Sequence, residues 1–224
     1  MFTLEIPLSS AAVDEIKAEL TRTLPDVKSS HRCEAFARGL GFQTYASLLA
    51  ATARGPVSAM INAAHFIGYL VGHGFEASPL PFYRATARVA LRAVLEKVPK
   101  LTEFGIGIGS PRFNLDFSKE REALLGDDAT EQFLQCVAFF SKLEKTKSIF
   151  RGMNSYGLKH AAERFACTYP EGAVLGPRYV SNGVLIAAAV HAGFDLKISK
   201  DNLGQDEPNA YFNISKRSID AVAA

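Results

Sequence analysis

Two stretches of the C-terminal half decide the fold that we expect: KLEKTKSIFRGMNSYGLKHAAERF (residues 142–165) and GPRYVSNGVLIAAAVHAGF (residues 176–194). The first is basic at its start and passes through a glycine into an alanine-containing helical pattern. The second repeats that pattern, and both helices open with an aromatic residue beside small polar ones: Ser155 and Tyr156, then Tyr179, Ser181 and Asn182. We therefore expect a basic approach followed by two short helices whose first turns are exposed.

The rest of the C-terminal half alternates strand and helix patterns. The residues around Ser110-Pro111, from 102 to 117, predict two joined strands, and residues 130–145 predict a helix. Residues 194–199 and 210–215 predict two terminal strands separated by a loop rich in turn formers. This half, residues 101–224, is thus expected to be an α+β domain with a small antiparallel sheet packed by helices.

The N-terminal half, residues 1–100, is predicted to be a helical domain with one N-terminal strand. Residues 2–8 alternate like a strand, and Ser9 or Ser10 is placed to cap the helix that follows. Two short helices are expected around Gly41, the first capped by Ser29 or Ser30 and the second by Thr44. Longer helices are predicted over residues 57–71 and 83–98. The fold class expected for the chain is therefore α+β.

Composition places the chain among ordinary globular proteins. It has 224 residues, of which 48% are hydrophobic and 21% charged, and its formal net charge is +2. Any binding of nucleic acid must therefore come from a local patch. The three cysteines form no CxxC pair, and the N-terminus lacks the features of a secretory signal. These features predict a reduced, cytoplasmic protein with no membrane span.

The motifs of common enzymes and metal sites are not visible. GIGIGS (residues 105–110) fits neither a phosphate loop nor a dinucleotide-binding turn, and the five histidines form no HxH or HExxH pair. His160 and Glu163 stand three residues apart on one expected helix, a spacing that more often gives a weak electrostatic contact than a catalytic pair. We predict no catalytic residue, no metal and no cofactor, which leaves an enzyme only as a third hypothesis.

A local excess of positive charge surrounds the first alanine-rich helix. Between residues 142 and 164 there are six lysines and arginines against two glutamates. Such a patch would give salt-dependent affinity for phosphates, with serine and tyrosine hydroxyls as further donors. The residues predicted to bind nucleic acid are Lys145, Lys147, Arg151, Ser155, Tyr156, Lys159, Arg164, Arg178 and Tyr179. Two alternatives stay open: residues 142–147 are the solvated end of a helix and the alanines are core, or the region is a protein-partner site.

CEAFARGLGFQTYASLLAA (residues 33–51) has the outline of a helix–turn–helix. Gln43, Thr44 and Ser47 would then have to read bases, whereas the following Leu-Leu-Ala-Ala is apolar. A packed helical hairpin is therefore the favoured interpretation of this stretch.

Two resemblances add to this interpretation. SSHRCEAFARGLGFQTYASLLAA (residues 29–51) resembles a helical domain described as glyoxalase-related, with the recurrent pattern HRxEAxARxLGFxTYAxLLA. It implies a fold relationship over about residues 1–98 but no reaction, because the metal ligands of a glyoxalase are missing. The second half, SYGLKHAAER…YVSNGVLIAAAVHAGF, is similar to uncharacterised proteins of bacterial plasmids and integrating elements.

These observations predict an accessory protein of a bacterial mobile element that binds DNA, RNA or another polyanion through the basic patch. The alternative is a protein-interaction module or homodimer that docks through the alanine-rich helices, Ala161, Ala162 and Ala187–Ala189.

Overall fold

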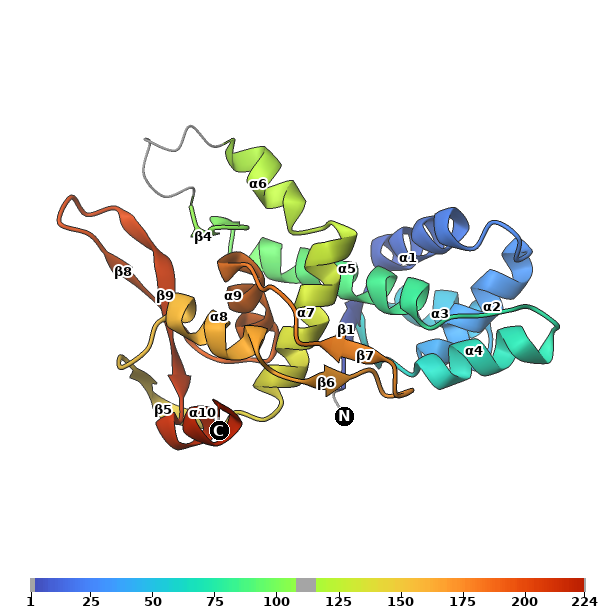
Figure 1. Ribbon diagram of the computed structural model, residues 1–224. Coiled ribbons are helices and arrows are strands. Elements are labelled where there is room, and N and C mark those ends of the chain that lie inside the picture. The colour runs from blue at the N-terminus through green and yellow to red at the C-terminus, as the bar shows by residue number, and fades with distance from the viewer. Residues whose placement is uncertain (1–2, 108–115, 224) are drawn as a thin grey trace. The chain divides into compact units, whose positions relative to one another are not determined.

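The computed structural model describes residues 3–107 and 116–223, and its fold is α+β with small antiparallel sheets (Figure 1). Contacts divide the chain into two compact units, residues 3–90 and residues 91–223. The division falls inside a helix, whereas the sequence changes character at Leu101. Among the described residues, no helix is both long enough and apolar enough to cross a membrane.

The first unit is mainly helical. Its elements are β1 (Glu5–Leu8), α1 (Ser10–Thr23), α2 (Ser29–Gly39), α3 (Tyr45–Thr52), β2 (Val57–Met60), α4 (Ala63–Gly72) and the first part of α5 (Leu80–Lys97). Three local signals act as predicted: Ser9 accepts a hydrogen bond from the Ala12 amide, Thr44 forms a capping box with Ser47, and Gly41 has a φ of 86°. In contrast, α2 begins after Lys28 without a side-chain cap.

Two predictions for this unit need correction. It contains two strands instead of one, and the helix expected over residues 57–71 begins only at Ala63. Val57–Met60 is β2, which pairs antiparallel with β1, and Glu5 lies opposite Met60. Gly55-Pro56 ends α3, and the Asn62 side chain accepts a hydrogen bond from the His65 amide to begin α4. Pairing with β1, a non-local interaction, therefore overrides the local apolar pattern. The core of this unit is mostly aliphatic and includes Phe66 and Phe82, whose rings stack with their centroids 4.7 Å apart.

The second unit contains a three-stranded antiparallel sheet and the helices that pack on it. Its helices are the end of α5, α6 (Phe117–Ala123), α7 (Asp127–Phe140), α8 (Ser155–Glu163), α9 (Asn182–His191) and α10 (Lys216–Ala223). Its strands are β3 (Leu101–Thr102), β4 (Gly105–Ile106), β5 (Lys145–Phe150), β6 (Cys167–Thr168), β7 (Val174–Gly176), β8 (Leu196–Lys200) and β9 (Asp206–Ile214).

The sheet has the order β5-β9-β8, and α8 and α9 both pack against its central strand (Figure 1). Helix α9 also packs along α7, and its apolar residues from Val184 to Ala189 are fully buried. Gly183 lies in the first turn of α9, where its amide donates to the Glu103 carbonyl oxygen at 2.9 Å. A Cβ atom at that position would lie 1.8 Å from the Thr102 carbonyl oxygen, so only glycine fits this approach.

The structure corrects several expectations for this unit. The predicted helix over residues 130–145 ends at Phe140, and residues 145–150 form strand β5 instead of a solvated helix end. The first strand expected before Ser110 is a short hairpin, β3–β4, and Phe117 begins α6. Most of the second strand expected after Pro111 lies outside the described residues.

Candidate nucleic-acid interface

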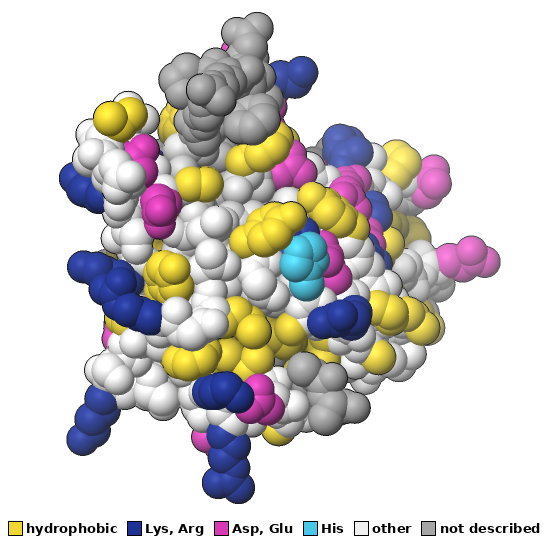
Figure 2. All heavy atoms as spheres, turned by 60° about the vertical axis from the view of Figure 1, so that its left-hand side comes forward, with side chains coloured by type: hydrophobic (Ala, Val, Ile, Leu, Met, Phe, Trp, Pro, Cys, Tyr) yellow, Lys and Arg dark blue, Asp and Glu magenta, His cyan; other side chains and the backbone are white. Residues whose placement is uncertain are grey.

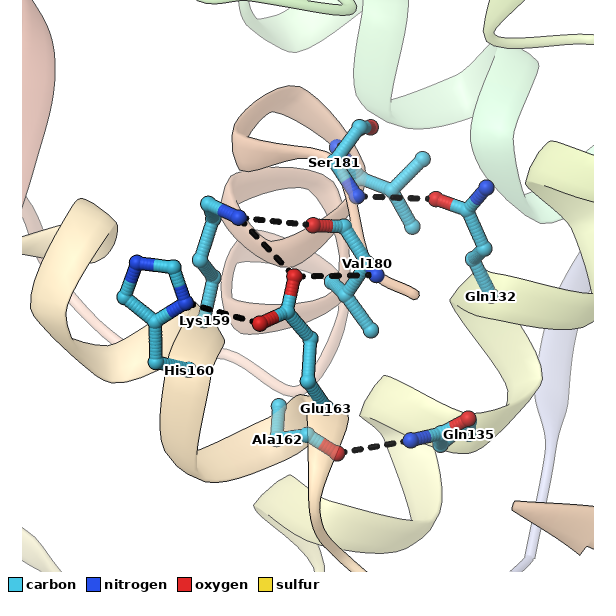
Figure 3. A network of polar contacts seen from close by, with 9 residues as sticks. Gln132, Gln135, Lys159, His160, Ala162, Glu163, Val180 and Ser181 are labelled. Atoms are coloured by element: carbon cyan, nitrogen blue, oxygen red, sulfur yellow. Dashed lines mark hydrogen bonds and ion pairs between the residues drawn. The ribbon is translucent and has the colours of Figure 1, made fainter. Parts of the chain in front are cut away.

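A polar clasp joins α8 to the segment that precedes α9 (Figure 3). The Lys159 ammonium donates to Glu163 Oε1 at 2.9 Å and to the Val180 carbonyl oxygen at 3.4 Å. Glu163 Oε1 also accepts from the Val180 amide at 3.4 Å, while Glu163 Oε2 lies 2.7 Å from His160 Nδ1. One carboxylate therefore holds two side chains of its own helix and the backbone of a distant segment.

The protonation of Glu163 follows from this arrangement. Burial raises the pKa of the Glu163 carboxyl, but hydrogen bonds from Lys159, His160 and the Val180 amide outweigh burial, and the pKa is lowered overall. The carboxylate is therefore charged at neutral pH and balances the ammonium of Lys159, whose side chain is only 8% exposed. Lys159 is thus paired inside the clasp, and its charge is not presented at the surface.

Two exposed tyrosines lie close to this buried ammonium. The Tyr156 and Tyr179 ring centroids are 5.2 Å and 5.1 Å from Lys159 Nζ, a distance typical of cation–π contacts. The two residues are 53% and 64% exposed, so much of each ring faces solvent. Lys159 therefore orients two aromatic rings that come from different segments of the chain, α8 and the loop before α9.

Two of the predicted phosphate donors instead hold the fold together. The Ser155 side chain is fully buried, and its Oγ accepts a hydrogen bond from the Ala210 amide at 3.0 Å, which ties α8 to β9. Arg178 pairs with Glu131 of α7 and donates to the Leu175 carbonyl oxygen at 2.8 Å. Ser155 therefore has no free surface, and Arg178 already has an anionic partner.

The remaining predicted cations are exposed. Lys145 and Lys147 lie on β5, Arg151 follows it, and Arg164 ends α8. Within the described part of the chain, none of these four side chains takes part in an ion pair. The charges of these four side chains are therefore available to an external anion. Figure 2 shows one face of the molecule, with Lys and Arg side chains projecting at its lower edge and left side and hydrophobic side chains gathered near its centre.

The structure adds an aromatic surface that the sequence pattern did not identify. The Arg151 guanidinium lies 6.0 Å from the centroid of Tyr211 on β9, and Lys197 of β8 is the direct partner of Tyr211 in the strand register. Directly opposed residues project from the same face of a sheet, so Lys197 and Tyr211 share one face. The neighbouring buried residue Phe212 belongs to the other face. In the sequence, the alternation of side chains along the strand expected over residues 210–215 could have indicated that Tyr211 and Phe212 lie on opposite faces.

Acidic side chains also occur in this region. Glu144 and Asp195 are exposed, and Asp195 accepts a hydrogen bond from the Asn213 side chain at 2.9 Å. The surface region consequently carries cationic and aromatic side chains together with some acidic ones.

The His160–Glu163 pair weighed for catalysis is held in structural contacts, as are the polar side chains of Asn182 and Glu34. His160 binds Glu163 within the clasp, whereas the Asn182 amide donates to the carbonyl oxygens of Phe104 and Pro208. Glu34 accepts from the Tyr45 amide at 3.2 Å and so helps to begin α3. Among residues 3–107 and 116–223, no cluster of three or more His, Cys, Asp or Glu could hold a metal ion.

The alanines expected to form a docking face lie mostly inside the molecule. Ala162 and Ala187–Ala189 are fully buried, and only Ala161 is partly exposed. Docking through the alanine-rich helices, the alternative considered from the sequence, therefore does not fit this fold. The small residues instead let α9 approach α7 and β3 closely.

The fold and this surface define the class only as an α+β protein with a cationic, tyrosine-bearing face. No protein-family model matches the chain, and comparisons with curated proteins and with solved structures found no match. The two resemblances noted from the sequence thus remain expectations.

Proposed function

We propose that this chain binds single-stranded nucleic acid through the face that carries β5, the start of α8 and the loop before α9. The observation that supports this most directly is the pair of exposed tyrosines, Tyr156 and Tyr179, whose rings both contact the buried Lys159 ammonium. Exposed rings that are fixed in place can stack on unpaired bases with little loss of side-chain freedom.

The exposed cations supply the second component of such an interface. Lys145 and Lys147 lie on β5 and Arg151 follows its end, and all three are exposed cations that could contact phosphates. Arg151 also lies beside Tyr211, which adds another ring to the same region. Aromatic residues for bases and cations for phosphates are the combination that sequence-tolerant single-strand binders use.

The cellular role and compartment that we propose for this activity follow from the resemblance of the second half. The second half is similar to proteins of bacterial plasmids and integrating elements, which favours an accessory role in mobile DNA in the bacterial cytoplasm. A protein partner is the competing ligand for the same exposed tyrosines, and direct measurement of oligonucleotide binding separates the two.

Fluorescence anisotropy of labelled oligo-dT and of a labelled duplex tests the proposal. The wild-type chain should bind oligo-dT at low salt and bind it more tightly than the duplex. Replacing both tyrosines by leucine should weaken oligo-dT binding by about 1–3 kcal/mol per stacked base.

The matched control is the double variant Tyr156→Phe with Tyr179→Phe, which retains both rings and should bind like the wild type. Equal losses in the leucine and phenylalanine variants would assign the effect to the hydroxyls and contradict stacking. Absence of oligo-dT binding at low salt would overturn the proposal.

A further inference from the structure

The first unit contains a cavity of about 530 Å³ that the proposed function does not use. It lies between α4 and the connection from α2 to α3. Its lining residues are Arg38, Gly41, Phe42, Gln43, Ala64, His65, Gly68 and Tyr69. Its volume is within the range of small-molecule sites, which is about 300–1,000 Å³.

Two glycines keep this cavity open. A Cβ atom built on Gly41 or Gly68 would meet no atom within 4 Å, so both positions border empty space. Gly41 has a φ of 86° and turns the chain out of α2. Ala64 and Gly68 lie one turn apart on α4, and their small side chains leave space along that side of the helix. The hollow is therefore built into the backbone of both walls.

The chemistry of the lining favours a negatively charged ligand. Its polar side chains come from Arg38, Gln43, His65 and Tyr69, and no aspartate or glutamate lines the cavity. Arg38 is exposed and, among the described residues, has no ion-pair partner. The acid one turn earlier on α2, Glu34, is bound instead to the Tyr45 amide at 3.2 Å.

The arginine is also held in place. Its guanidinium lies 5.2 Å from the centroid of the Tyr69 ring. Tyr69 is in turn fixed by His73, stacked at 4.2 Å, and by His31, whose Nδ1 is 3.3 Å from the tyrosine hydroxyl. Fixed donors bind an anion at a lower entropic cost than mobile ones.

We propose that this cavity binds a small organic anion, with Arg38 contacting its carboxylate or phosphate group. The volume exceeds what an inorganic anion fills, and Phe42 and Tyr69 provide apolar walls for a planar body. Gln43 and His65 are the accompanying hydrogen-bond donors.

The test is an amide NMR titration of the full chain, in which Gly41 and Gly68 report from the two walls. Phenyl phosphate and benzoate are the probes, inorganic phosphate tests the head group alone, and benzyl alcohol is the neutral analogue. We expect one of the two aromatic anions to shift both glycine signals, and its identity distinguishes a phosphate ester from a carboxylate. Inorganic phosphate should bind more weakly than that probe.

Two variants locate the binding. Arg38→Gln should weaken it by about tenfold or more, whereas Arg54→Gln, an exposed arginine outside the cavity, should leave it unchanged. Gly68→Leu should block it while adding a good helix former where space is open. Equal binding of benzyl alcohol, no shift with either aromatic anion, or full affinity in Arg38→Gln or Gly68→Leu would overturn the proposal.

Discussion

The ammonium nitrogen of Lys159 lies 2.9 Å from Oε1 of Glu163, one turn further along α8. Both side chains are largely buried, with exposed fractions of 8% and 20%. Because each charge neutralises the other away from bulk water, the pair fixes the position of the two tyrosines that pack around Lys159. The clasp thus has a positioning role, and the proposed binding surface lies outside it.

Breaking the clasp should lower stability. In Glu163→Ala the Lys159 ammonium keeps only the Val180 carbonyl as acceptor, so the free energy of unfolding should fall by about 1–3 kcal/mol. Urea denaturation followed by circular dichroism measures this change. The control is Glu76→Ala, an exposed acid, which should change stability by less than about 0.5 kcal/mol. Equal stability of the two variants would contradict the role of the clasp.

Acid should remove the contribution of Glu163 to stability. The pKa of this carboxyl is lower in the folded chain than its ordinary value of 4.5, so its contribution is complete above that value. The contribution of Glu163 should disappear as the pH falls through the lower pKa that this carboxyl has in the folded chain. We therefore expect the unfolding free energies of wild type and Glu163→Gln, measured at a series of pH values, to differ less at pH values below the ordinary pKa of the carboxyl. A difference that grows on acidification would mean that folding raises this pKa, which contradicts the hydrogen bonding of the clasp.

The close approach at Gly183 should be intolerant of any side chain. A Cβ atom there would overlap the Thr102 carbonyl oxygen, which is backbone and cannot move aside without displacing β3. We expect Gly183→Ala to lower stability by about 1–3 kcal/mol or more, measured by thermal unfolding. Gly68→Ala, at an open helical position, should instead raise stability by about 0.5–1 kcal/mol. A neutral Gly183→Ala would show that α9 does not pack as described.

The three thiols should differ in reactivity. Cys33 and Cys136 are buried and Cys167 is partly exposed. Burial strongly raises the pKa of Cys136, and burial also raises the pKa of Cys167 despite the opposing effect of Arg178. A thiol reagent at neutral pH should therefore modify Cys167 slowly and first, with all three reacting in denaturant. Rapid native labelling of Cys136 would contradict the packing of α7.

Local signals predicted the parts of the fold that depend on a few neighbouring residues. The caps at Ser9 and Thr44 and the left-handed turn at Gly41 are of this kind, because each is decided within one helical turn. The α+β class followed from the order of such segments.

The missed elements depend on distant partners. KTKSIF became β5 because β9, more than sixty residues later, pairs with it, and Val57–Met60 became β2 because β1 does. The same reason separates the predicted site residues. Ser155 is drawn inside by the Ala210 amide and Lys159 by Glu163, while Lys147 stays exposed, and no spacing in the sequence distinguishes these outcomes.

The salt dependence of oligo-dT binding tests the proposed function most directly. Log affinity should fall linearly with log salt, because each phosphate contact releases a bound cation. In the triple variant Lys145→Gln, Lys147→Gln, Arg151→Gln the slope should become shallower by about two, at roughly 0.7 per lost contact. The matched triple variant of Lys17, Lys28 and Arg54 removes the same charge from exposed positions of the first unit and should keep the wild-type slope. Identical slopes for wild type and both triple variants would contradict the account.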